Sequence, residues 1–158
     1  TVYCAGVNFP DDATAGVADV NTLDAYEEGT FTPIYVSSGA SFSHATQVGT
    51  YTKIGRVVYF DIYLVSNSAA SGTAANAVYI GGLPFACASS KYSFGGNVAS
   101  TSQWGGDSPT TGLVTQGAST IELKYFDYSD GETTGIRYDD MATGTSDNYV
   151  AIYGFYHV

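Results

Sequence analysis

Residues 56 to 65 read Arg-Val-Val-Tyr-Phe-Asp-Ile-Tyr-Leu-Val, which is the clearest secondary-structure signal in the chain. An apolar set of residues alternates in it with an amphipathic set, and the period of two predicts a β-strand. The apolar set, which should face the core, is Val58, Phe60, Ile62 and Leu64; the other is Val57, Tyr59, Asp61 and Tyr63. Tyrosine is favoured where a surface meets a partner. The second face is therefore expected to pack against either another sheet of the same chain or a neighbouring subunit.

Shorter stretches of strand character follow on both sides, separated by polar loops. The expected strands are 30–37, 46–52, 77–81, 92–99, 113–116, 119–126, 133–138 and 149–158. The expected loops include 37–43, 67–76, 100–110 and 139–147, and a short helical turn closed by Gly29 is expected at 24–29. The stretch 149–158 is apolar on both faces, which predicts a strand in the middle of a sheet.

Length and composition favour one all-β domain. The chain has 158 residues with 44% hydrophobic but only 13% charged side chains, and it holds 19 Gly and 14 Tyr. These values are typical of a β-sandwich with many turns, and the strand pattern predicts the jelly-roll type. We expect residues 22–158 to form this domain and residues 1–21 to be an extended lead-in that docks on another chain.

Charge and cysteine usage narrow the classes of partner. The formal net charge is −10, and residues 1–50 carry six acids without one Lys or Arg. Such a field repels phosphate groups, so neither a nucleic acid nor an anionic membrane is an expected partner. No run of about 18 apolar residues exists, so membrane insertion is not expected. Cys4 and Cys87 are expected to remain unpaired thiols in a reducing compartment, and their number leaves one disulfide between them as the alternative.

No catalytic constellation can be read from the sequence. Acidic pairs occur at 27–28, 127/130 and 139–140, but each lies in an expected turn, where solvated carboxylates are ordinary. The chain has no Gly-x-Ser-x-Gly elbow, no zinc spacing and no phosphate-binding glycine loop. The cluster at 127–132 lacks the spacing of an EF-hand, which leaves calcium binding by Asp127 and Asp130 open. We therefore assign no catalytic residue, no metal and no cofactor.

Two loop segments have the residue types of a carbohydrate site. Sugar binding commonly stacks a ring on an aromatic side chain while acids and amides bond the hydroxyls. The candidates are Gln103, Trp104 and Asp107 in one loop and Tyr138, Asp139 and Asp140 in the other. The alternative for Trp104 is a plug that folds back on the core.

Three ordered motifs carry a resemblance to a known family. They are Thr-Leu-Asp-Ala-Tyr-Glu-Glu-Gly-Thr-Phe-Thr-Pro at 22–33, Gly-Thr-Tyr-Thr-Lys-Ile-Gly at 49–55 and Gly-Leu-Pro-Phe at 82–85. Together they resemble a block of bacteriophage tail fibre and tailspike proteins, with Ala25 where Asp is usual. Val-Asn-Phe-Pro at 7–10 is similar to the end of a fibre-shaft segment. The resemblance covers about residues 1–85.

The resemblance implies a homotrimeric receptor-binding domain at the tip of a virion fibre, assembled in the host cytoplasm. It would bind a bacterial surface polysaccharide, lipopolysaccharide or capsule, during host adsorption, and 1–21 would come from an upstream shaft or β-helix. No catalytic residue is transferred, because tailspike depolymerase sites lie in a separate upstream domain. The recognisable block is expected to be scaffold, and the loops after Phe85 to meet the host. The alternatives are a C-terminal trimerisation cap without glycan binding and, more weakly, an accessory deacetylase or glycosidase.

Overall fold

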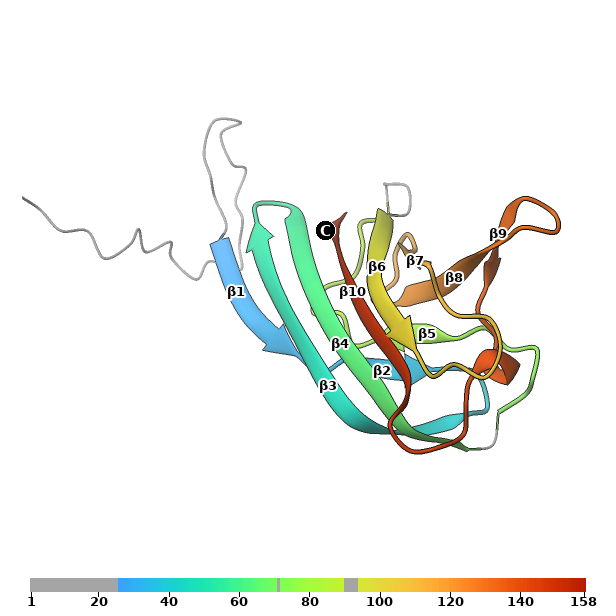
Figure 1. Cartoon of the computed structure of the whole chain (residues 1–158). Helices are drawn as coiled ribbons and strands as arrows, with labels where there is room; N and C mark the ends of the chain where they lie inside the picture. The colour runs from blue at the N-terminus through green and yellow to red at the C-terminus, as the bar shows by residue number, and fades with distance from the viewer. Residues whose placement is uncertain (1–25, 71, 90–93) are drawn as a thin grey trace, which may run out of the picture.

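The protein is a curled antiparallel sheet, as the computed structural model of residues 26–70, 72–89 and 94–158 shows (Figure 1). The strands are β1 (Tyr26–Phe31), β2 (Ile34–Val36), β3 (Ser41–Ile54), β4 (Val57–Ala70), β5 (Tyr79–Gly81), β6 (Phe94–Ser102), β7 (Thr111–Val114), β8 (Ile121–Asp127), β9 (Glu132–Gly135) and β10 (Asp147–His157). In the described ranges the only helical element is the 3₁₀ turn η1 (Tyr138–Asp140). The all-β prediction is confirmed.

The sheet follows the order β1-β3-β4-β10-β6-β7-β8-β5-β2, with β9 added beside β8. Long curved strands β3, β4, β10 and β6 run side by side, and β2 and β5 lie behind them (Figure 1). The curl places the inner faces of these two groups against each other. β10 pairs with β4 on one side and β6 on the other, so the prediction of a central C-terminal strand is confirmed. Among the described residues, no helix is long and apolar enough to cross a membrane.

The core fills the inside of the curl. Phe60 and Leu64 of β4, with Val58 and Ile62, are at most 4% exposed, as the alternation predicts. Fully burying an apolar side chain of this size contributes about 1.5–3 kcal/mol. The opposing wall of the core is supplied by Ile80, Val114, Ile121, Leu123 and Ile136, and β10 adds Val150, Ile152 and Tyr156.

The other face of β4 is open to solvent. Tyr59 and Tyr63 remain 49% and 44% exposed, and Asp61 between them is exposed as well. The option that another sheet of the same chain covers this face is therefore wrong within the described residues. The physical reason is that the sheet curls toward its apolar side and leaves the tyrosines outside. Packing against a neighbouring subunit stays a prediction.

The N-terminal part of the sheet differs from the sequence expectation. Tyr26–Phe31 is strand β1 and not a helical turn, because six residues pair in register with Ile54 to Gly49 of β3. The single strand expected at 30–37 is wrong as well. Its residues divide between β1 and β2, with Pro33 in the gap, since proline has no N–H to give to a ladder. β1 and β2 are the two ends of the strand path.

The three motifs of the recognised block come together in space. The Tyr51 ring lies over Gly29, and the Phe31 ring lies over Gly49, its partner in the register. An added Cβ at either glycine would approach the ring to within 2.6–2.8 Å, so each glycine makes room for an aromatic ring. From the third motif, Phe85 packs edge-on against Tyr51 at 5.6 Å between centroids. The described parts of the three motifs thus form one packed unit; residues 22–25 of the first motif lie outside the described residues.

Several loops are shorter than expected because polar residues extend the strands. Ser41 and Ser43 of β3 pair with Ala70 and Ser68 of β4, so both strands reach into the Ser/Ala-rich segments read as loops. At the other end of the chain, Tyr138 lies in η1 rather than in a strand. Buried Cys87 is a free thiol. The lead-in at 1–21, Cys4 and the first two residues of the strand expected at 92–99 lie outside the described residues.

Side chains of β3 bond to the backbone of β2 and of the residue before it, where no ladder joins the two strands. The backbone N–H of Tyr35 in β2 donates to Nε2 of His44 in β3 at 3.0 Å. Beside it, Nε2 of Gln47 donates to the carbonyl oxygen of Pro33 at 2.9 Å. A histidine nitrogen accepts a hydrogen bond only when it carries no proton. The junction of β2 and β3 therefore requires neutral His44.

We expect the protein to lose stability on mild acidification through His44. Burial lowers the pKa of His44 from its ordinary value of 6.5, so the folded chain binds this proton less readily than the unfolded chain does. The contribution is complete above pH 6.5 and is lost as the pH falls toward the lowered folded pKa. Chemical denaturation at pH 7.5 and 5 should show a loss on the order of 1 kcal/mol. In His44→Gln, the glutamine can accept the hydrogen bond from Tyr35 but does not titrate, so this variant should lose less stability between pH 7.5 and 5. An equal loss of stability in both proteins would contradict the role given to His44.

Candidate functional site

Backbone strain is concentrated where two loops meet the ends of β6 and β10. In the described chain, three residues other than glycine have positive φ: Gln103 (60°), Ser146 (60°) and Asn148 (52°). Such conformations cost on the order of 1 kcal/mol or more for a residue with a Cβ, and they cluster at functional sites. This corner is therefore a candidate functional site.

Asn148 holds the corner together. It is fully buried, and its Nδ2 donates to Oγ of Ser66 at 2.7 Å and to the carbonyl of Ala142 at 2.8 Å. Its Oδ1 accepts the N–H of Ala142 at 2.8 Å, its own N–H donates to the carbonyl of Gln103, and its carbonyl accepts the Tyr35 hydroxyl. Every polar group of Asn148 is thus paired, which fixes Gln103 and the 142–148 segment relative to β4.

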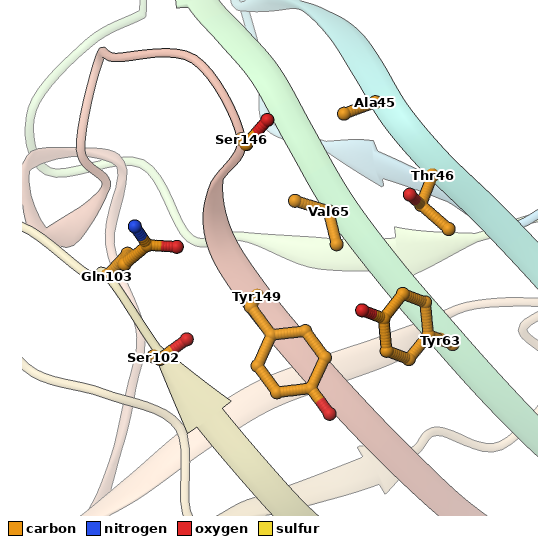
Figure 2. A pocket seen from close by; sticks show the side chains of 8 residues that line it. All are labelled: Ala45, Thr46, Tyr63, Val65, Ser102, Gln103, Ser146 and Tyr149. Atoms are coloured by element: carbon orange, nitrogen blue, oxygen red, sulfur yellow. The ribbon is translucent and has the colours of Figure 1, made fainter.

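A hollow of about 440 Å³ opens beside this corner on the outer face of the sheet (Figure 2). We call it the neutral hollow, because neither acid nor base lines it. Its lining is Ala45, Thr46, Tyr63, Val65, Ser102, Gln103, Ser146 and Tyr149. The rings of Tyr63 and Tyr149 lie 5.0 Å apart between centroids, with hydroxyls, one amide and apolar carbon around them. Such a mixed lining suits a ligand with apolar faces and many hydroxyl groups.

β-bulges shape this side of the sheet. The β3–β4 register steps from His44↔Ser66 to Thr46↔Val65, which leaves Ala45 as an extra residue. The β10–β6 register steps from Ala151↔Ser100 to Ile152↔Val98, which leaves Ala99 extra. Bulges bend a strand and re-aim its side chains, and they are frequent beside binding sites. Ala45 lines the neutral hollow, and Ala99 lines a second hollow beside it.

The side chain of Trp104 points toward the core, whereas its neighbour Gln103 lines the neutral hollow. Its indole N–H donates to the carbonyl of Tyr149 at 3.0 Å, and its ring meets the Tyr35 ring edge-on at 6.1 Å. The side chain is half-buried against the core. This is the plug arrangement that was the alternative for Trp104, and it supports the floor under Tyr149. Tyr138 also packs inward, against Phe42 at 6.1 Å.

The remaining candidates meet at a different place, which we call the acidic hollow. Its volume is about 380 Å³, and its lining includes Asp107, Asp139 and Asp140 together with Asp127 and Asp130. The loop residue Asp107 reaches it because its N–H donates to Oδ1 of Asp140 at 3.2 Å, and Gly105 and Gly106 donate to the Asp140 carbonyl. Oδ2 of Asp140 accepts the N–H of Arg137, which is also in the lining.

Hydrogen bonds within the chain occupy several of these carboxylates. Asp127 accepts from the Ser129 hydroxyl at 2.6 Å and from the Ser129 N–H at 2.8 Å, and these bonds lower the pKa of Asp127. The hydrogen bond to Asp107 raises the pKa of Tyr125, with burial and the charges of Asp107, Asp127 and Asp140 acting in the same direction. Asp130 accepts from the N–H of Glu132 at 2.9 Å. The bonds of Asp127 and Asp130 stabilise the β8–β9 turn. The five aspartates of the lining make the hollow repulsive to anions.

The predicted site residues therefore divide among three environments. Gln103 lines the neutral hollow, Asp107, Asp139 and Asp140 line the acidic hollow, and Trp104 and Tyr138 pack inward. The residue pattern gives no signal for Tyr149 or Ser146, and it marks Tyr63 only as part of a contact face. The signal for Tyr63 was its place in the outward set of β4.

No group of three or more His, Cys, Asp or Glu side chains that could hold a metal ion occurs in residues 26–70, 72–89 and 94–158. Comparison of the chain with protein families, with curated proteins and with solved structures finds no match.

Proposed function

We propose that this chain is the distal domain of a bacteriophage tail fibre or tailspike and binds a bacterial surface polysaccharide, lipopolysaccharide or capsule, during host adsorption. The observation that carries the binding role is the neutral hollow, which combines two tyrosine rings with the Gln103 amide and hydroxyl groups beside a strained, rigidly held backbone. The three-motif resemblance supplies the biological setting. The proposal places the domain in the virion and gives it neither catalysis nor a cofactor.

The finer architecture belongs to the same proposal. The two groups of strands that face each other across the core support a β-sandwich, and we propose the jelly-roll type for it. We also propose that the functional unit is a homotrimer. Its support is the exposed aromatic pair Tyr59 and Phe155, which are 49% and 46% exposed with ring centroids 6.1 Å apart. Exposed aromatic clusters are typical of surfaces that a partner covers.

The same aromatic pair favours a second candidate function, a trimerisation cap that stabilises a tailspike depolymerase and binds no glycan. In that case the outer face would serve assembly alone. The two candidate functions differ in whether the neutral hollow binds a glycan. Tyr59 and Phe155 lie outside the lining of this hollow, so assembly and glycan binding can be tested separately.

The deciding experiment measures assembly and binding on the same preparations. Sedimentation gives the oligomeric state, and biolayer interferometry gives binding to purified lipopolysaccharide and capsule from a panel of bacterial strains. We expect trimers that bind at least one polysaccharide, and about tenfold weaker binding for Gln103→Gly at unchanged oligomeric state. Glycine removes the amide without strain at a positive φ. Tyr59→Ala should instead weaken the trimer.

Intact trimers that bind no polysaccharide of the panel would overturn the receptor role and favour the cap. A chain that stays monomeric at micromolar concentration would overturn the trimer. Binding that survives both Gln103→Gly and Tyr149→Ala would remove the neutral hollow from the proposal.

A further inference from the structure

A second hollow, of about 240 Å³, adjoins the neutral hollow on the outer face of the sheet. The two share Tyr63 in their linings. We call the second one the Asp61 hollow; its exposed lining residues include Val48, Asp61, Tyr63, Ala99 and Tyr153. Its carbon-rich walls carry a single acidic side chain and no basic one.

The strand registers show how the two hollows follow each other. Across β3, β4 and β10, the row Val48–Tyr63–Ala151 is followed by the row Thr50–Asp61–Tyr153. On β10 the small Ala151 lies between the outward tyrosines 149 and 153, which leaves space between two rings. Beyond the bulged Ala45, the lining on β3 runs from Thr46 to Thr50, a span of about 13 Å at the rise of a β-strand. The two hollows thus lie on either side of Tyr63, and we call them together the groove.

We infer that this groove binds an uncharged oligosaccharide, with one sugar residue in the neutral hollow and the next in the Asp61 hollow. This inference rests on the proposed function and adds the class of glycan and the second subsite. The Tyr153 and Tyr63 rings offer apolar faces to a sugar ring. The Asp61 carboxylate accepts hydrogen bonds from sugar hydroxyls, and such charge-assisted bonds are strong. The same carboxylate, in a chain with a net charge of −10, repels uronic acids and phosphorylated sugars.

The test uses calorimetric titration of the full chain with four tetrasaccharides. Chitotetraose, maltotetraose and mannotetraose are the neutral probes, and tetragalacturonate is the acidic one. We expect binding of at least one neutral probe and at least tenfold weaker binding of tetragalacturonate. Asp61→Asn should weaken the neutral complex about tenfold and narrow the difference between neutral and acidic probes. Tyr153→Ala should weaken it by a similar factor.

Two control variants remove the same chemical groups, one carboxylate and one tyrosine ring, at positions outside the groove. Glu132→Gln removes one exposed negative charge on β9, and Tyr128→Ala removes a tyrosine that is 91% exposed in the β8–β9 turn. Both should bind like the wild type. Equal affinity for acidic and neutral probes, no binding of any neutral probe, or unchanged affinity in Asp61→Asn and Tyr153→Ala would overturn the inference. If host polysaccharide binding is nevertheless lost in Gln103→Gly, the proposed function stands without this second subsite.

Discussion

Replacing Asn148 with alanine is expected to lower the free energy of unfolding by about 3–5 kcal/mol. The substitution removes two donors and one acceptor at a fully buried position. The Ser66 hydroxyl and the backbone of Ala142 lose these partners, and a buried polar group without one costs about 1–3 kcal/mol. A positive φ adds strain for alanine, because its Cβ approaches the following carbonyl.

Two further variants separate these contributions. Asn148→Gly has no strain at φ 52°, so it should be about 1 kcal/mol more stable than the alanine variant while lacking the same hydrogen bonds. Asn76→Ala is the control, because its Nδ2 makes one exposed bond to the carbonyl of Ser38, and it should cost less than about 1 kcal/mol. Urea denaturation followed by circular dichroism measures all three. A loss at Asn148 no larger than at Asn76 would show that the buried network is not needed.

Replacing Gly154 with alanine is the second large effect, a loss of about 2 kcal/mol in the free energy of unfolding. A Cβ at Gly154 would lie 2.9 Å from the carbonyl oxygen of Gly95, 3.0 Å from Cα of Gly96 and 3.0 Å from the Phe60 ring. Two of these neighbours are backbone atoms of β6, so β6 and β10 must separate where Phe60 packs beneath them. Valine at the same position should cost more.

Gly95 provides the matched control one strand away. A Cβ there meets no atom of the described residues within 4 Å, and the φ of Gly95 is not positive, so Gly95→Ala should change stability by less than about 0.5 kcal/mol. Thermal unfolding of both variants under one condition gives the comparison. Equal losses in the two variants would contradict the close contact, and so would a stable Gly154→Val protein.

How much the sequence could predict depends on whether a residue's partner is close in the chain. The inward-facing residues of β4 were predictable, because apolar residues at every second position can all face a core when the chain forms a β-strand. β1 was not, because Glu27, Glu28 and Gly29 show no apolar period. They become a strand through pairing with residues 53 to 51, more than twenty positions later.

The candidate site was predictable only in part, for a similar reason. Residue types identified Gln103, but a bulge at Ala45 or Ala99 leaves no mark in composition, since alanine is ordinary in any strand. The inward turn of Trp104 follows from the left-handed backbone at Gln103 and from the Tyr149 carbonyl that receives its N–H. Both are tertiary features. The sequence predicted Asp107 and Asp140 as polar loop residues, but it could not predict that the two loops lie close together in space.

The pairing of β1 with β3 also has a mechanical consequence. Residues 1–25 precede β1, so tension along the chain from that side enters the sheet at Tyr26. There it meets six residue pairs, with the Tyr51 ring over Gly29 and the Phe31 ring over Gly49. A pull along the strand direction loads this ladder in shear, and each ring must slide off its glycine before β1 can move. The strand order then places β3 and β4 between that load and the groove floor on β10.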